Sequence, residues 1–141
     1  VGIVGKDILL EQGSDVYELL DLNIGKCRMA VAAPEGYVED KNRTLRVATK
    51  YVNITKEFYA GRNREIDIIK LNGSIELAPL LGLTDVIVDI VETGSTLREN
   101  HLKVIEEFRN ISARFIANKT SFKFENTIIS DMMTKLREQI K

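Results

Sequence analysis

The segment DIVETGST, residues 89–96, places two carboxylates directly before a cluster of hydroxyl side chains. The carboxylates are Asp89 and Glu92. The residues after them are three hydroxyl residues around one glycine: Thr93, Gly94, Ser95 and Thr96. Hydroxyl and backbone N–H donors suit a phosphate group, whereas carboxylates repel a bare phosphate but can hold sugar hydroxyls or a bridging Mg²⁺ ion. The combination therefore indicates a ribose phosphate as the ligand.

This segment follows the apolar run DVIVDIV, residues 85–91, which is typical of a buried parallel strand. A helix that begins directly after a strand presents unpaired N–H groups in its first turn, and Gly94 would let a phosphate approach the backbone closely. The alternative is that Thr93 or Ser95 merely caps that helix, since such caps are common. Composition leaves both interpretations open, but the position at the carboxyl end of a strand favours a ligand site.

The surrounding segments alternate between strand-like and helix-like patterns and predict an α/β fold. Strands are expected at residues 44–50, 65–71 and 85–91, and helices at 53–61, with Asn53 as the N-cap, and at 73–82. This β-α-β-α-β order predicts a parallel sheet. Residues 102–120 fit either two strands or a helix and a strand. The last segment predicts an amphipathic helix whose apolar face consists of Ile128, Ile129, Met132, Met133, Leu136 and Ile140.

Two further turns follow strand-like runs, at residues 1–5 and 65–71, and carry polar residues. The segment NGSIELAP places Ser74 and Glu76 at the start of a short helix, where helix capping by Ser74 is the alternative to a binding role. The segment GIVGKD contains Gly5, Lys6 and Asp7. It lacks the glycine spacing of a P-loop and the Ser or Thr that follows the P-loop lysine, so we reject a nucleoside-triphosphatase loop. Its strand-turn-helix context still allows these three residues to line a cleft.

Composition narrows the classes of function. The chain has 141 residues with 20 basic and 21 acidic side chains and a formal charge of −1, so nothing predicts nucleic-acid binding. One cysteine, Cys27, excludes an internal disulfide. No apolar run reaches the ~20 residues of a membrane span and no signal peptide is evident, so we expect no membrane partner and a cytoplasmic location. The single histidine, His101, has no partner to orient it and is expected at the surface.

Three segments, in order, resemble one known enzyme family. GLTDVIVDIVETGSTLRENHL resembles the phosphoribosyl pyrophosphate motif of ATP phosphoribosyltransferase, and residues 1–34 and 71–83 resemble other parts of that family. The resemblance extends from residue 1 to about residue 121. It implies transfer of the 5-phosphoribosyl group from phosphoribosyl pyrophosphate to N1 of ATP, with release of pyrophosphate and a requirement for Mg²⁺, as the first step of histidine biosynthesis.

The resemblance also implies a role for each candidate residue. The residues that would bind the 5′-phosphate are Thr93, Gly94, Ser95 and Thr96. Asp89 and Glu92 would lie near the reacting ribose. The residues that would line the cleft, beside the nucleotide or the ribose, are Gly5, Lys6, Asp7, Ser74 and Glu76.

The implied fold consists of two α/β lobes similar to type II periplasmic binding proteins. Residues 1–32 and 117–141 would belong to the first lobe and residues 33–116 to the second. The opening strands and basic turn of the family do not precede Val1, so we expect an incomplete first lobe. The chain resembles the short form, which pairs with a separate regulatory subunit similar to histidyl-tRNA synthetase. The alternative function is a non-catalytic two-lobed module that binds a small ligand.

Overall fold

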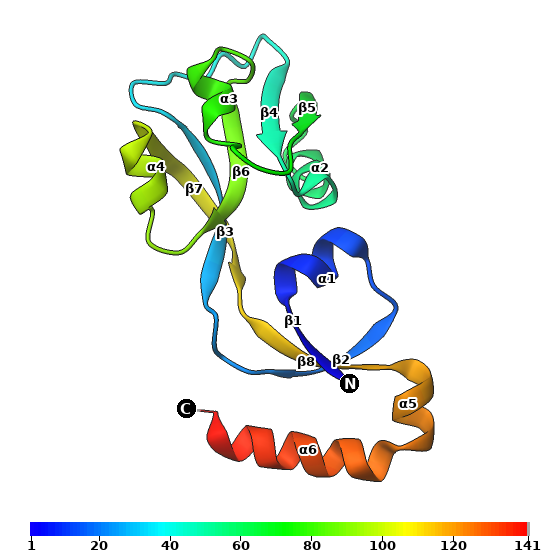
Figure 1. The fold of residues 1–141 in the computed structure, drawn as a ribbon. Helices are drawn as coiled ribbons and strands as arrows, with labels where there is room; N and C mark the ends of the chain where they lie inside the picture. Colours follow the sequence, from blue (N-terminus) through cyan, green and yellow to red (C-terminus); the bar gives the residue numbers. More distant parts are fainter. Residues whose placement is uncertain (141) are drawn as a thin grey trace. The chain divides into compact units, whose positions relative to one another are not determined.

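The computed structural model describes residues 1–140, which divide into two compact units. Among the described residues, unit 1 contains Val1–Cys27 and residues 110–140, and unit 2 contains Arg28–Arg109. The chain therefore leaves unit 1 once, forms unit 2 and returns (Figure 1). The lobe boundaries predicted after residues 32 and 116 lie a few residues beyond these points.

Unit 1 is a small antiparallel sheet with helices. Its elements are β1 (Gly2–Gly5), α1 (Lys6–Gln12), β2 (Val16–Asp21), β8 (Ala113–Asn118), α5 (Lys119–Phe124) and α6 (Asn126–Gln139). β8 lies between β1 and β2 and is antiparallel to both. Phe115 and Ala117 of β8 form an apolar core with Leu22 and with Ile129 of α6. Apolar burial between this sheet and α6 is therefore what stabilises the unit.

The apolar face of α6 is narrower than the sequence predicts. Ile129 is buried, and the other residues that pack against its core are Met133, Leu136 and Ile140. Ile128 and Met132 are 62% and 37% exposed, so the prediction that they share the buried face is wrong. Successive residues lie about 100° apart around a helix, which moves Ile128 and Met132 to the flank when Ile129 faces the sheet.

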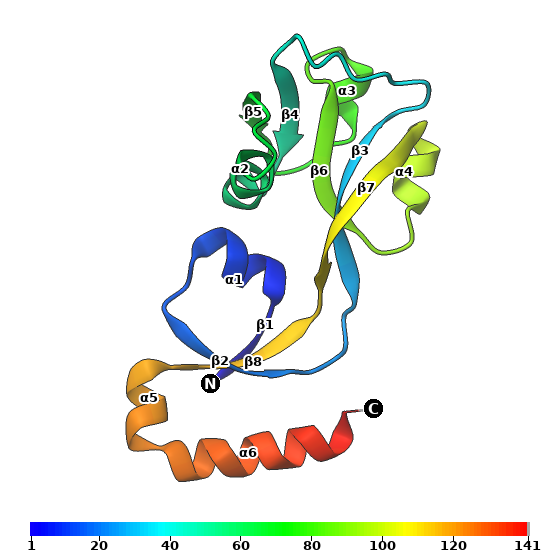
Figure 2. The same cartoon turned by 180° about the vertical axis from the view of Figure 1, so that it is seen from behind.

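Unit 2 is a mixed five-stranded sheet with three short helices. Its elements are β3 (Cys27–Pro34), β4 (Leu45–Thr49), α2 (Val52–Ala60), β5 (Ile66–Lys70), α3 (Leu77–Leu80), β6 (Val86–Val91), α4 (Ser95–Glu99) and β7 (Leu102–Ile111). The strand order is β5-β4-β6-β3-β7, which Figure 2 shows from behind. β4 is parallel to β5 and β6, as predicted, whereas β3 is antiparallel to β6. The segment after residue 101 forms two strands, β7 and β8.

Helices α3 and α4 pack on one face of this sheet. Ile75 and Ala78, at α3, and Leu97 of α4 belong to one buried cluster with Ile87 and Val91 of β6. Small residues of the neighbouring strands also belong to the cluster: Ala30, Ala32 and Ala48. Both ends of the segment after β6 are thus anchored in the core, since Val91 precedes it and Leu97 follows.

Two predicted helices differ in detail from the structure. α2 begins at Val52 with Tyr51 as its N-cap, so the prediction of Asn53 as N-cap is wrong. The N–H of Tyr51 donates a hydrogen bond of 2.9 Å to the Thr49 hydroxyl, which turns the chain before Asn53 is reached. α3 is a single turn, Leu77–Leu80, because Ser74 and Gly82, with φ of 54° and 74°, leave helical backbone geometry on either side of it.

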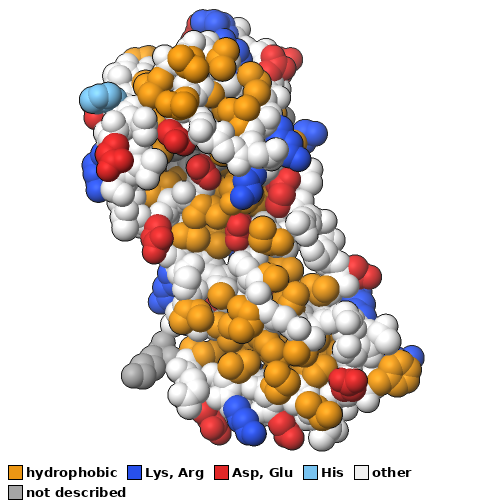
Figure 3. Space-filling view, in the orientation of Figure 1, with side chains coloured by type: hydrophobic (Ala, Val, Ile, Leu, Met, Phe, Trp, Pro, Cys, Tyr) orange, Lys and Arg blue, Asp and Glu red, His pale blue; other side chains and the backbone are white. Residues whose placement is uncertain are grey.

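The surface carries both signs of charge. Figure 3 shows acidic and basic side chains interspersed over the visible face, without a large patch of one sign. His101 is exposed, as predicted, and takes a positive φ of 57°. Within residues 1–140, no helix combines the length and apolar character needed to cross a bilayer.

Candidate active site

Asp89 lies near the carboxyl end of β6, between two neighbouring strands. On one side it is in register with Ala30 of β3. On the other side Thr49, the last residue of β4, is in register with Val88. Lys50 follows directly after β4 and is close enough to Asp89 to lower the pKa of that carboxyl.

The surroundings of Asp89 disfavour its negative charge. Burial raises the pKa of this half-buried carboxyl above its ordinary value. A hydrogen bond of 2.8 Å from the N–H of Ile90 lowers the pKa, nearby Glu76 raises it and Lys50 lowers it, with burial prevailing. A half-buried acid with a raised pKa at the carboxyl edge of a parallel sheet is a candidate for a functional group.

The hydroxyl residues form an exposed loop directly after β6. β6 ends at Val91 and α4 begins at Ser95. The hydroxyls of Thr93 and Ser95 lie 3.1 Å apart, and the N–H of Ser95 donates a hydrogen bond of 3.4 Å to the Thr93 hydroxyl. Thr93, Ser95 and Thr96 are all exposed. Three hydroxyls and the N–H groups of one helical turn are therefore gathered at the surface, as a phosphate site requires.

Helix capping does not account for this loop. The N-cap of α4 is Gly94, with φ of 78°, which makes no side-chain capping hydrogen bond. The Thr93 hydroxyl accepts the N–H of Ser95, the first residue of the helix, only at a long 3.4 Å. A positive φ of this size is readily adopted by glycine and strained in other residues. Neither Thr93 nor Ser95 is therefore the N-cap, contrary to that alternative, and the three hydroxyl side chains remain exposed to a ligand.

Glu92 differs from Asp89 in its environment. Its side chain is exposed, while its backbone carbonyl accepts a hydrogen bond of 3.3 Å from the Arg28 guanidinium. Of the two acids predicted to act together, Asp89 is thus half-buried and Glu92 is exposed to solvent. No cluster of three or more His, Cys, Asp or Glu side chains suited to a metal ion occurs among residues 1–140.

The turn after β5 approaches the same edge of the sheet. Ser74 is exposed with φ of 54°, and the N-cap of α3 is Glu76, so the capping role considered for Ser74 is not observed. Ile75 is buried against Ile87, which holds the turn over β6. Glu76 is close enough to raise the pKa of Asp89. The structure therefore brings Glu76 and Asp89, distant in sequence, into one electrostatic environment.

Gly5, Lys6 and Asp7 belong to unit 1, at the junction of β1 and α1. Lys6 forms an ion pair of 2.6 Å with Glu18 of β2. Asp7 is buried, and its carboxylate lies where a Cβ on residue 5 would be, so only glycine fits at Gly5 without a shift of Asp7. Their predicted position in a cleft stays a prediction.

Comparisons with known proteins decide the family. Residues 1–138 match the family described as HisG, ATP phosphoribosyltransferase. The chain belongs to the ATP phosphoribosyltransferase family. This confirms the expected function and enzyme class, a phosphoribosyltransferase of histidine biosynthesis.

Two curated relatives illustrate how far the likeness extends. The chain is 63% identical over 139 residues to the ATP phosphoribosyltransferase of Brachyspira hyodysenteriae, covering 98% of this chain and 68% of the relative. It is 55% identical over 141 residues to that of Lachnoclostridium phytofermentans, covering 98% and 66%. The chain thus spans about two thirds of the length of these relatives.

Solved structures support the same fold class. The ATP phosphoribosyl transferase (HisG:HisZ) complex from Thermotoga maritima matches with a TM-score of 0.88 and 35% identity, covering 99% of this chain and 69% of that one. The arginine-bound truncated ArgBP from T. maritima matches with a TM-score of 0.60 at 13% identity, covering 93% and 63%. The second likeness shows the fold alone, the α/β architecture of type II periplasmic binding proteins, and does not favour a solute-binding function.

Several residues of this ATP phosphoribosyltransferase chain lie at the candidate site without having been predicted. Lys50 is close enough to lower the pKa of Asp89, and Arg28 and Arg98 donate to carbonyl groups of the loop after β6. Lys50 could have been found by aligning the ends of the predicted parallel strands. Arg28 could not, because its approach depends on the antiparallel pairing of β3 with β6.

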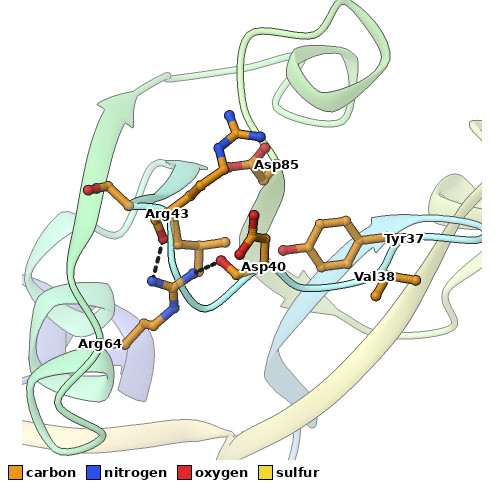
Figure 4. A pocket seen from close by; sticks show the side chains of 8 residues that line it. Tyr37, Val38, Asp40, Arg43, Arg64 and Asp85 are labelled. Carbon is orange, nitrogen blue, oxygen red and sulfur yellow. Dashed lines mark hydrogen bonds between the residues drawn. The ribbon is translucent and has the colours of Figure 1, made fainter.

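A small cavity of about 90 Å³ lies at the opposite edge of the sheet (Figure 4). Its lining consists of Tyr37, Val38, Asp40, Arg43, Thr44, Leu45, Arg64 and Asp85. The Arg64 guanidinium donates to the Glu39 carboxylate at 2.9 Å and to the carbonyls of Asp40 and Arg43 at 3.1 and 2.6 Å. The Arg64 guanidinium is thus already paired with groups of the protein itself. The cavity lies at the amino ends of the parallel strands. Ligands of α/β sheets bind at the other edge.

Proposed function

We propose that the protein to which this chain contributes transfers the 5-phosphoribosyl group from phosphoribosyl pyrophosphate to N1 of ATP and releases pyrophosphate. The observation that carries the proposal is the hydroxyl loop, residues 93–96, which opens directly after the strand that carries Asp89. Family membership supplies the reaction, and this loop supplies a place for the substrate's 5′-phosphate.

In this proposal the loop binds the 5′-phosphate. The hydroxyls of Thr93, Ser95 and Thr96 and the first N–H groups of α4 donate to phosphate oxygens. Gly94 takes the positive φ that the turn requires and adds no side chain between the ligand and the backbone. Phosphate binding would fix the ribose with its C1 at a defined distance from the carboxyl edge of the sheet.

Asp89 and Glu92 are proposed to stabilise the reacting ribose. Departure of pyrophosphate from C1 leaves positive, oxocarbenium-like charge on the sugar, and a carboxylate placed beside it lowers the free energy of that state. The half-buried position of Asp89 strengthens such an interaction, since burial lowers the effective dielectric constant around it. Correct placement and electrostatics account for this chemistry without a nucleophilic side chain.

A requirement for Mg²⁺ is consistent with the available donors. Mg²⁺ is usually held by one or two carboxylates together with substrate phosphates rather than by an all-protein cage. Asp89 and Glu92 provide oxygen ligands of this kind at the site. A bound Mg²⁺ would neutralise charge on the departing pyrophosphate.

ATP and the regulatory partner complete the proposal. Ser74 and Glu76, on the turn after β5, and Gly5, Lys6 and Asp7 of unit 1 are proposed to line the cleft that receives the nucleotide or the ribose. The similar T. maritima structure is that of a HisG:HisZ complex. We extend that pairing to this protein and propose a regulatory subunit similar to histidyl-tRNA synthetase, together with a cytoplasmic location.

Titration calorimetry and a product assay test the proposal. The full-length protein, supplied with its regulatory subunit, should bind phosphoribosyl pyrophosphate in the presence of Mg²⁺ and form phosphoribosyl-ATP when ATP is added. Thr93→Ala should weaken binding of phosphoribosyl pyrophosphate, because one charge-assisted hydrogen bond is worth about 1.5–3 kcal/mol.

Thr120→Ala is the matched control, since Thr120 is also an exposed threonine but lies on α5 of unit 1. Its affinity should equal that of the wild type. Binding of an amino acid or a simple anion without binding of phosphoribosyl pyrophosphate would support the small-ligand module instead.

A further inference from the structure

Two arginines hold consecutive carbonyl groups of the loop after β6. The Arg28 guanidinium donates a hydrogen bond of 3.3 Å to the carbonyl of Glu92. The Arg98 guanidinium donates one of 3.2 Å to the carbonyl of Thr93. Arg28 lies on β3 and Arg98 on α4, so the two side chains reach the loop from different elements.

These hydrogen bonds determine the direction of the loop's N–H groups. In a planar trans peptide the N–H points away from the carbonyl of the same unit. The hydrogen bond from Arg28 to the Glu92 carbonyl therefore directs the N–H of Thr93 away from Arg28. The hydrogen bond from Arg98 to the Thr93 carbonyl likewise directs the N–H of Gly94 away from Arg98. Donors that are already oriented bind an anion without the entropic cost of ordering the loop.

The two arginines differ in how much of their charge is available. Arg28 forms an ion pair of 2.5 Å with Glu107, which offsets its positive charge. Arg98 is exposed, and no ion pair involving it occurs among residues 1–140. The uncompensated charge of Arg98 therefore favours an anion at the loop, whereas Arg28 has mainly a geometric effect.

Gly94 is coupled to Arg98 by direct contact. A Cβ on residue 94 would lie 3.2 Å from a terminal nitrogen of Arg98. The N–H of Arg98 also donates a hydrogen bond of 3.1 Å to the carbonyl of Gly94, one helical turn earlier. The absence of a side chain at residue 94 thus lets the guanidinium lie against the loop backbone.

We infer that Arg98 is a positioning residue for the phosphate-binding loop and supplies its uncompensated positive charge. The ligand concerned is a phosphate monoester dianion, the 5′-phosphate of phosphoribosyl pyrophosphate, so the inference rests on the proposed function. Arg98 acts through the Thr93 carbonyl and through its electric field, and takes no part in bond making or breaking.

Three variants of the intact enzyme test this inference by calorimetry and steady-state kinetics. Arg98→Gln should weaken binding of phosphoribosyl pyrophosphate about tenfold, a change of about 1.4 kcal/mol, and raise its KM, while the KM for ATP stays unchanged. Arg98→Lys should recover part of the affinity, since lysine keeps the charge but lacks the planar fork. Lys56→Gln removes one positive charge from the exposed face of α2 and should match the wild type.

A positioning role of Arg98 predicts a change only in the KM for phosphoribosyl pyrophosphate. General destabilisation of the enzyme would change the KM for both substrates. If Arg98→Gln folds poorly, Arg98→Lys serves as the test, and its affinity for phosphoribosyl pyrophosphate should be lower than that of the wild type. Equal affinity of all variants for phosphoribosyl pyrophosphate would overturn the inference and leave the proposed function standing. A wild-type protein that does not bind this ligand would overturn both.

Discussion

The hydroxyl of Thr49 donates a hydrogen bond of 2.7 Å to the carbonyl of Val88, the residue directly before Asp89. The same hydroxyl accepts from the N–H of Tyr51 at 2.9 Å, and the Thr49 carbonyl accepts from the N–H of Leu71 at 3.1 Å. Thr49 is fully buried, with 0% exposure. One side chain and its carbonyl therefore connect the carboxyl ends of β4, β5 and β6.

Thr49→Val should destabilise the protein by about 1–3 kcal/mol, because the Val88 carbonyl and the Tyr51 N–H lose a buried partner. Thr49→Ser keeps the hydroxyl and should cost roughly 1 kcal/mol for the lost methyl group. Urea unfolding measures both. Thr55→Val is the matched control: Thr55 is also fully buried and donates at 2.7 Å, but to the Tyr51 carbonyl within α2. Only Thr49→Val should also weaken binding of phosphoribosyl pyrophosphate.

Asp89→Asn should stabilise the free protein at neutral pH. The pKa of Asp89 is raised by burial above its ordinary value of 3.8, so the folded state binds more protons than the unfolded state between the two values. The stability of the wild type therefore falls as pH rises from 3.8 through the folded pKa, and the variant escapes this loss. Urea midpoints measured against pH should differ at pH ~7 and converge below the ordinary pKa. If Asp89→Asn were less stable than the wild type at neutral pH, that result would contradict a raised pKa of Asp89 in the folded state.

Charge changes around Asp89 should move its pKa in opposite directions. Glu76→Gln should lower the pKa of Asp89, because it removes a neighbouring negative charge, and Lys50→Gln should raise it. Carbon-13 NMR titration of the carboxyl group measures both changes. Lys56→Gln, on the exposed face of α2, should leave the titration unchanged. Shifts of the same sign in the first two variants would refute this arrangement of charges.

Gly94→Ala should cost about 1–2 kcal/mol of stability from its positive φ of 78°. It should also weaken binding of phosphoribosyl pyrophosphate, since the added Cβ displaces Arg98. Gly36→Ala separates the two effects, because Gly36 has a φ of 81° with open space around its Cβ position. That control should lose similar stability and no affinity. Thermal unfolding and calorimetry measure the two quantities.

Arg64→Lys should destabilise unit 2 by about 1–2 kcal/mol, because lysine cannot reproduce the three hydrogen bonds of the guanidinium fork. Arg62→Lys is the control: the Arg62 side chain is 53% exposed in its ion pair with Glu106, against 14% for Arg64, and surface pairs contribute about 1 kcal/mol or less. Neither variant should change the affinity for phosphoribosyl pyrophosphate. A loss of affinity in Arg64→Lys would make the cavity in Figure 4 part of a ligand site.

The sequence by itself determined the parallel β4-α2-β5-α3-β6 order and the hydroxyl loop after β6, because both depend on local patterns. An uninterrupted apolar run predicts a buried strand, and Gly94 between hydroxyl residues predicts an exposed turn. The resemblance to the family likewise followed from contiguous segments, residues 1–34, 71–83 and 82–102. These features need no knowledge of which elements meet in space.

Only the tertiary structure decided how the site is supported. The raised pKa of Asp89 depends on burial and on Glu76. The fixed carbonyls of the loop depend on Arg28, brought from β3 by antiparallel pairing, and on Arg98. The exposure of Ile128 and Met132 likewise depends on how α6 is rotated on its sheet. Apart from the short-range contact of Arg98 with Thr93, these features arise from contacts between residues distant in sequence, about which local periodicity carries no information.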